Sequence, residues 1–161
     1  MLFCKLLGAL FAISAGVCGA VLLNREADRR IDEVEAWIAL LRLTKNQIDC
    51  FSLPQREILA RCDEGLLRRL GWTGNKPPEE FSALGSSLRE SRLTEEGERI
   101  ARGFTEEIGK GYRAEQLHTC DYAIGLFCAE RDRLLSQLGG ARKRNTTLCL
   151  CGAVALAIVL L

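Results

Sequence analysis

Histidine clusters, paired cysteines and strand-like runs are all missing from this chain of 161 residues. His118 is the only histidine, so a histidine-rich metal site and a relay that needs a second imidazole are excluded. The eight cysteines include no Cys-x-x-Cys pair, the ligand spacing that is typical of zinc sites. Because no run of alternating β-branched residues occurs either, the sequence predicts an all-α protein.

Groups that could carry out catalysis do not converge. His118 precedes Cys120 and Asp121 at spacings that do not all fall on one helix face, and a lone histidine on a charged helix is usually solvated. Gly109-Lys110-Gly111 lacks the strand and the full spacing of a phosphate-binding loop, so it is expected to punctuate helices. We therefore expect no enzyme, no cofactor, no metal and no small-molecule substrate. An enzyme that uses His118 is the remoter alternative.

Charge is concentrated in the middle of the chain. Of the 22 Lys and Arg residues only Lys5 lies outside residues 24–144, and this middle part holds all 21 Asp and Glu residues. The middle is therefore densely charged but neutral overall. Because a neutral domain exerts no long-range attraction on phosphates, nucleic-acid binding is not expected.

Both ends of the chain are apolar. Leu6 to Leu23 carries no charge and as a helix reaches about 27 Å, close to the roughly 30 Å hydrocarbon core of a bilayer. Leu148 to Leu161 is also uncharged but covers only about 21 Å, so it crosses fully only if it begins near Asn145. We predict a membrane anchor at 1–23, a helical bundle at 24–144 and a hydrophobic membrane segment at 145–161.

Basic residues border the middle domain at both membrane ends. Lys and Arg close to a membrane segment favour the cytoplasmic side. The bundle is therefore expected to face the cytoplasm, with both termini leaning outward. The flanking basic residues are Arg25, Arg29, Arg30, Arg142, Lys143 and Arg144.

The cysteines leave an alternative open. In apolar or buried settings they are expected to be reduced, structural thiols. If the N-terminal segment were instead a cleaved signal peptide, the chain would be an exported helical protein. Disulfides would then involve Cys50, Cys62, Cys120 and Cys128.

Apolar residues at steps of three, four and seven predict about five helices in the middle of the chain. The first continues from the N-terminal apolar segment and breaks at Phe51-Ser52-Leu53-Pro54, with Ser52 as the next cap. Further helices are predicted from the Ser52 cap to Leu70, over 79–92, from a Thr94 cap to Ile108, and from Tyr112 to a stop at Gly139-Gly140.

Three stretches combine in an order that points to a known family. They are the N-terminal anchor, the segment Ile48-Asp49-Cys50-Phe51-Ser52-Leu53-Pro54 with Glu57 to Cys62, and the run from Ile108-Gly109-Lys110-Gly111-Tyr112 through Glu115-Gln116-Leu117 to Arg142-Lys143-Arg144. The chain resembles the stage III sporulation protein AB family of endospore-forming bacteria. The resemblance covers essentially the whole length, and these three stretches are its strongest parts.

The resemblance implies a fold and a role. The family's helical bundle is similar to the cytoplasmic domain of type II secretion protein F. The resemblance further implies a component of the channel complex between mother cell and forespore, in the mother-cell membrane around the forespore. The implied partners are the ATPase stage III sporulation protein AA and other membrane components of the complex.

A loop held between two rigid helices is a common place for function. We therefore expect the partner to bind at the turn between the last two helices of the middle domain. The candidate residues are Gly109, Lys110, Gly111, Tyr112, Arg113 and Gln116.

Overall fold

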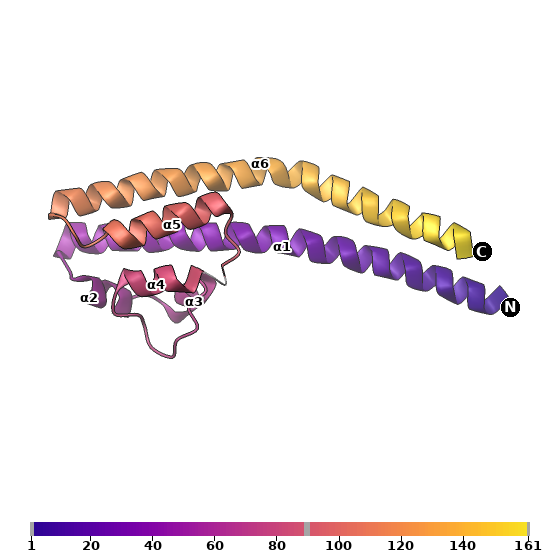
Figure 1. The fold of residues 1–161 in the computed structure, drawn as a ribbon, viewed down its shortest axis with the longest axis horizontal. Coiled ribbons are helices and arrows are strands. Elements are labelled where there is room, and N and C mark those ends of the chain that lie inside the picture. The colour runs from indigo at the N-terminus through magenta and orange to yellow at the C-terminus, as the bar shows by residue number, and fades with distance from the viewer. Residues whose placement is uncertain (1, 89–90, 161) are drawn as a thin grey trace. The chain divides into compact units, whose positions relative to one another are not determined.

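In the computed structural model, every regular element among the described residues is a helix. The structure describes residues 2–88 and 91–160. Within this range it describes no side chain at 2–7, 9–10, 12–13, 23, 87, 141, 145, 150, 153, 156–157 and 159–160. The helices are α1 (Leu2–Phe51), α2 (Gln55–Ala60), α3 (Glu64–Arg69), α4 (Phe81–Ser87), α5 (Glu95–Glu107) and α6 (Arg113–Leu160), as Figure 1 shows. The predicted all-α class is confirmed for the described residues.

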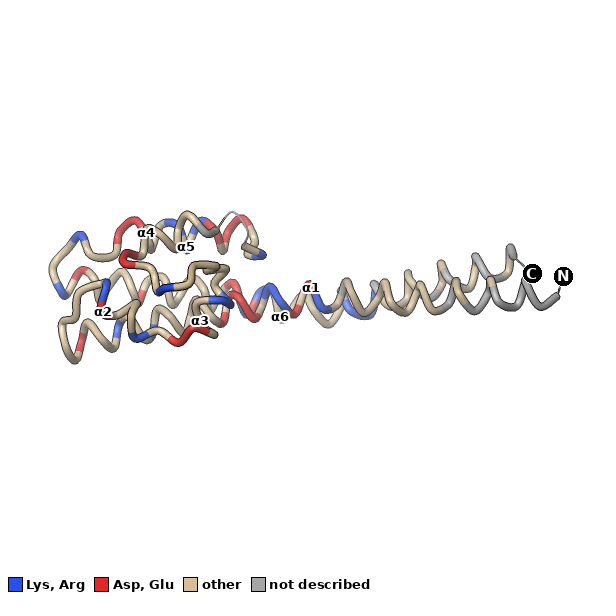
Figure 2. The backbone as a smooth tube through the Cα atoms, turned by 90° about the horizontal axis from the view of Figure 1, so that it is seen from below, with Lys and Arg blue, Asp and Glu red and all other residues tan. Residues whose placement is uncertain are grey.

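The chain divides into two compact units. Unit 1 consists of Met1–Arg29 and Leu134–Leu161, and unit 2 consists of Arg30–Arg133. Figure 2 shows that acidic and basic residues crowd the backbone of unit 2. The long helices α1 and α6 each contribute to both units, whereas α2 to α5 belong to unit 2 alone.

Unit 2 is organised around two aromatic contacts. Trp37 of α1 stacks on Phe127 of α6 with ring centroids 5.8 Å apart and an angle of 7° between the planes. Phe81 of α4 meets Phe104 of α5 edge to face at 5.5 Å. All four rings are almost fully buried. Because aromatic side chains bury large apolar areas, these pairs hold α1 to α6 and α4 to α5.

The predicted cap of α5, Thr94, is confirmed, and its hydroxyl also makes a second hydrogen bond. The Thr94 hydroxyl accepts a hydrogen bond from the Gly97 amide at 3.1 Å, as an N-cap should. The same hydroxyl donates to the buried Glu130 carboxylate of α6 at 2.5 Å. Arg133 donates to the other oxygen of Glu130 at 2.7 Å and lowers the pKa of that carboxyl, with a smaller contribution from Thr94. The cap therefore ties α5 to α6.

Several predicted helix boundaries are wrong. Gly139-Gly140 does not stop a helix, because α6 continues to Leu160. Ser52 has φ +51°, and Pro54 occupies the N-cap position of α2. The helix predicted from the Ser52 cap to Leu70 is two short helices, since the Asp63 side chain accepts from the Leu66 amide and starts α3 anew. The helix predicted over 79–92 is only seven residues long.

Unit 1 is built from the N-terminal stretch of α1 and the C-terminal stretch of α6, which lie side by side (Figures 1 and 2). Arg142 donates a hydrogen bond to the Asp28 carboxylate. Gly19 faces Cys149, whose Sγ lies 3.9 Å from where a Cβ at position 19 would be. Ala20 is only 6% exposed. Small residues therefore let the two helices approach closely.

The predicted membrane segments at 1–23 and 145–161 include many side chains outside those that the structure describes. Over the residues it does describe, no helix has the length and apolar character needed to cross a membrane.

Candidate functional site

The turn between α5 and α6 depends on a glycine. Gly109 has φ +85°, a conformation that residues with a side chain rarely adopt. A Cβ at this position would lie 1.7 Å from Nε2 of Gln55. The backbone of residues 109–112, which we call the Gly109 turn, can therefore take this path only with glycine at its start.

Gln55, the first residue of α2, holds the start of the Gly109 turn. Its Nε2 donates to the Ile108 carbonyl at 3.0 Å, and its Oε1 accepts from the Phe81 amide at 3.4 Å. One half-buried side chain at the start of α2 thus connects the end of α5 with the start of α4. Gln55 was not predicted as a site residue, and no local pattern could have revealed it, because its partners lie 26 and 53 residues away.

The first turn of α6 braces the Gly109 turn from the other side. Arg113 donates to Oδ1 of Asp49 at 2.7 Å and also to the Asp49 carbonyl, so it is anchored to the end of α1. Gln116 donates to the Gly111 carbonyl at 2.8 Å. The Glu115 carboxylate accepts from the Tyr112 amide at 3.0 Å. Two of the predicted contact residues, Arg113 and Gln116, are therefore positioning residues.

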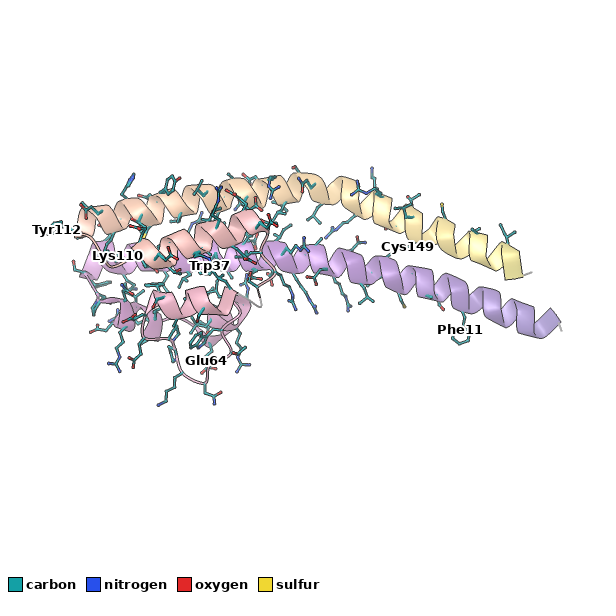
Figure 3. The ribbon with its side chains drawn as sticks, in the orientation of Figure 1. Phe11, Trp37, Glu64, Lys110, Tyr112 and Cys149 are labelled. Carbon is teal, nitrogen blue, oxygen red and sulfur yellow. The ribbon has the colours of Figure 1, made fainter. Side chains whose placement is uncertain are left out.

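The remaining predicted contact residues project outward. Tyr112 is 85% exposed and extends from the end of unit 2, as Figure 3 shows. Lys110, two residues earlier in the sequence, is also exposed. Phe51, which ends α1 two residues after Asp49, is 62% exposed. A cavity of about 400 Å³ lies at this end, lined by Ser52, Gln55 and neighbouring residues. The arrangement presents a cation and two aromatic rings on a rigid frame, which suits binding of a protein surface.

The predicted flanking basic residues divide between the units. Arg25, Arg29, Arg142, Lys143 and Arg144 lie in unit 1, and Arg30 begins unit 2. All six are exposed, and Arg142 pairs with Asp28.

The groups considered for chemistry lie apart. His118 is exposed on α6, whereas Cys120 is fully buried and its burial raises the pKa of the thiol to about 12. Burial likewise raises the pKa of the Cys62 thiol to about 11. Among the described residues no three His, Cys, Asp or Glu side chains gather as metal ligands. Gly109-Lys110-Gly111 follows a helix, so the backbone that a phosphate-binding loop needs is missing here.

The disulfide alternative finds no support among the described residues. Cys50, Cys62, Cys120 and Cys128 are all free thiols.

The described residues define an all-helical protein with an exposed turn that hydrogen bonds from neighbouring helices hold in place. The family model for stage III sporulation protein AB matches residues 5–161, so the chain belongs to that family and is a sporulation-related protein. No curated protein and no solved structure matches the chain. The likeness of its bundle to type II secretion protein F therefore stays a prediction.

Proposed function

We infer that the chain is a membrane-anchored structural component of the channel complex between mother cell and forespore. In this proposal it is not an enzyme; it docks the ATPase stage III sporulation protein AA and holds it at the membrane. The proposal rests on membership of the stage III sporulation protein AB family and on the braced, exposed Gly109 turn.

Exposed apolar side chains support anchoring through unit 1. Unit 1 is a pair of helices, and several of its large apolar residues face outward. Exposed apolar surface of this kind marks contact with lipid or protein. Basic residues border both helices, which favours unit 2 on the cytoplasmic side. The outward residues include Phe11, Leu22, Leu148 and Ile158, each more than 60% exposed.

The Gly109 turn supports docking through unit 2. Lys110 and Tyr112 are exposed, yet the backbone of the turn donates a hydrogen bond to Glu115 and accepts hydrogen bonds from Gln55 and Gln116. A surface that is ordered before binding loses little conformational entropy when a partner arrives. This braced exposure is the observation that carries the docking proposal.

Co-purification tests the proposal. The full chain, solubilised in nonionic detergent, is mixed with the ATPase at low and high salt. We expect a complex at low salt that weakens at high salt, because exposed charges contribute to the contact and are screened by salt. The docking role is wrong if no complex forms at either salt concentration while circular dichroism shows that the chain is helical.

A further inference from the structure

A groove lies on the surface of unit 2, between α5 and α6. It encloses about 490 Å³, and its apolar lining includes Ile100, Phe104, Ala123 and Leu126. Phe104 and Ala123 are buried in the core behind it, so the floor is rigid. Tyr122 lines the groove and is 64% exposed, although a tyrosine ring gains most when it is covered.

A missing side chain keeps the groove open. Gly103 lines it in the interior of α5, a helix position where glycine is unfavourable. A Cβ at Gly103 would meet no atom within 4 Å, so packing inside the chain does not require glycine here. The position instead leaves room for a side chain that comes from outside.

The helix that forms one wall of the groove is strongly acidic. It carries Glu95, Glu96, Glu98, Glu106 and Glu107 but only two basic residues, Arg99 and Arg102.

Of these charges, Glu96, Arg99 and Glu107 line the groove itself. Arg99 pairs with Glu96 at 2.5 Å, which offsets one of the acids. Glu107 lies in the last turn of α5, where the helix dipole disfavours negative charge. Since the position of Glu107 does not serve the stability of α5, a basic partner accounts for it better.

We propose that this groove binds a basic amphipathic helix of a partner protein. Its apolar side chains enter over Gly103 and against Tyr122, and its Lys and Arg residues face the glutamates of α5. This mode combines an apolar anchor with complementary charge at the rim, which fixes the choice of partner. The groove is a second surface, and the proposal does not depend on docking at the Gly109 turn.

The single histidine provides a site-specific probe. His118 lines the groove, so NMR of the full chain labelled at histidine gives one ring signal that reports on it. The ligand is a synthetic peptide of about 14 residues, enough to span α5 as a helix of about 20 Å, with Leu on one face and Lys on the other. A matched peptide with Glu in place of Lys is the control. Both are titrated into the same nonionic detergent at one pH.

We expect the Lys peptide to shift the His118 signal with saturation, more weakly at high salt, and the Glu peptide to leave it unchanged. Gly103→Leu fills the groove and should weaken the binding of the Lys peptide by at least about tenfold. Gly125→Leu is the matched control, because Gly125 is also an open position within a helix but does not line the groove.

Three results would overturn the proposal. The first is an equal shift, or none, with the two peptides. The second is binding that Gly103→Leu leaves intact, or that Gly125→Leu weakens as much. The third is a His118 signal that moves with protein concentration alone, since a second copy of the chain would then occupy the groove.

Discussion

Replacing Gly109 with alanine tests how the turn is held. Alanine at φ +85° costs roughly 1–2 kcal/mol in the backbone. Its Cβ would lie 1.7 Å from Nε2 of Gln55, so Gln55 must move and give up two hydrogen bonds, at about 1 kcal/mol each. We therefore expect Gly109→Ala to lower the free energy of unfolding of unit 2 by about 3–4 kcal/mol.

A double-mutant cycle separates the two costs. In a Gln55→Ala background the side chain that would collide is gone, so Gly109→Ala should cost only the backbone part, about 1–2 kcal/mol. Gly125→Ala is the control, because its Cβ meets nothing within 4 Å inside α6 and should stabilise the chain by about 0.5–1 kcal/mol.

Urea titration of the full chain in nonionic detergent, followed by tryptophan fluorescence, measures these changes. Both tryptophans, Trp37 and Trp72, lie in unit 2, so the signal reports on that unit. The account of the turn is refuted if Gly109→Ala changes stability by less than about 0.5 kcal/mol. It is also refuted if the cost of Gly109→Ala is the same with and without Gln55.

Three further predictions concern the interior of unit 2. Phe127→Ala removes the ring stacked on Trp37 and should cost about 3–5 kcal/mol in the same urea titration. The Cys120 thiol, with its pKa raised to about 12 by burial, should react with iodoacetamide at pH 8 roughly a thousandfold more slowly than a free cysteine, as mass spectrometry of the modified chain can measure. Comparable rates in native and unfolded chain would contradict its burial. Glu130→Gln should cost about 2 kcal/mol at neutral pH, since it weakens charged hydrogen bonds with Arg133. Because the folded pKa of Glu130 is lowered, this advantage is full above the unfolded pKa of about 4.3 and disappears as pH falls through the folded pKa. A gap between wild type and Glu130→Gln that stays constant from pH 7 to about pH 2 would contradict that pairing.

The sequence was a good guide wherever a local signal decides the structure. The Thr94 cap, the break before Pro54 and the buried stripe of α5 all depend on residues within a few positions of one another. Gly139-Gly140 misled because glycine inside a helix costs only about 1 kcal/mol, too little to end a helix that continues on both sides. Asp63 was overlooked as a cap, although aspartate is among the best capping residues.

The candidate site was only partly predictable. The exposed Gly109 turn follows from a glycine pair between two helical patterns, and Lys110 and Tyr112 do project from it. The anchoring of Arg113 was not predicted, because Asp49 lies 64 residues earlier and only the fold brings the two together. Gln55 and the α5–α6 groove likewise depend on tertiary packing, which one sequence does not reveal.

The pairing of Arg113 with Asp49 decides which residue of the turn is best replaced. Reversing its charge would place a carboxylate beside Asp49 and disturb the turn itself. Lys110 is exposed and forms no such pair among the described residues, so Lys110→Glu changes the surface alone. Lys76→Glu is the matched control, an exposed lysine in another loop of unit 2.

The most direct measurement is the affinity of these two variants for the ATPase stage III sporulation protein AA, in detergent at low salt. The docking proposal predicts that Lys110→Glu weakens the complex by about tenfold and that Lys76→Glu leaves it unchanged. Wild-type affinity of Lys110→Glu, or an equal loss in both variants, would contradict docking at the Gly109 turn.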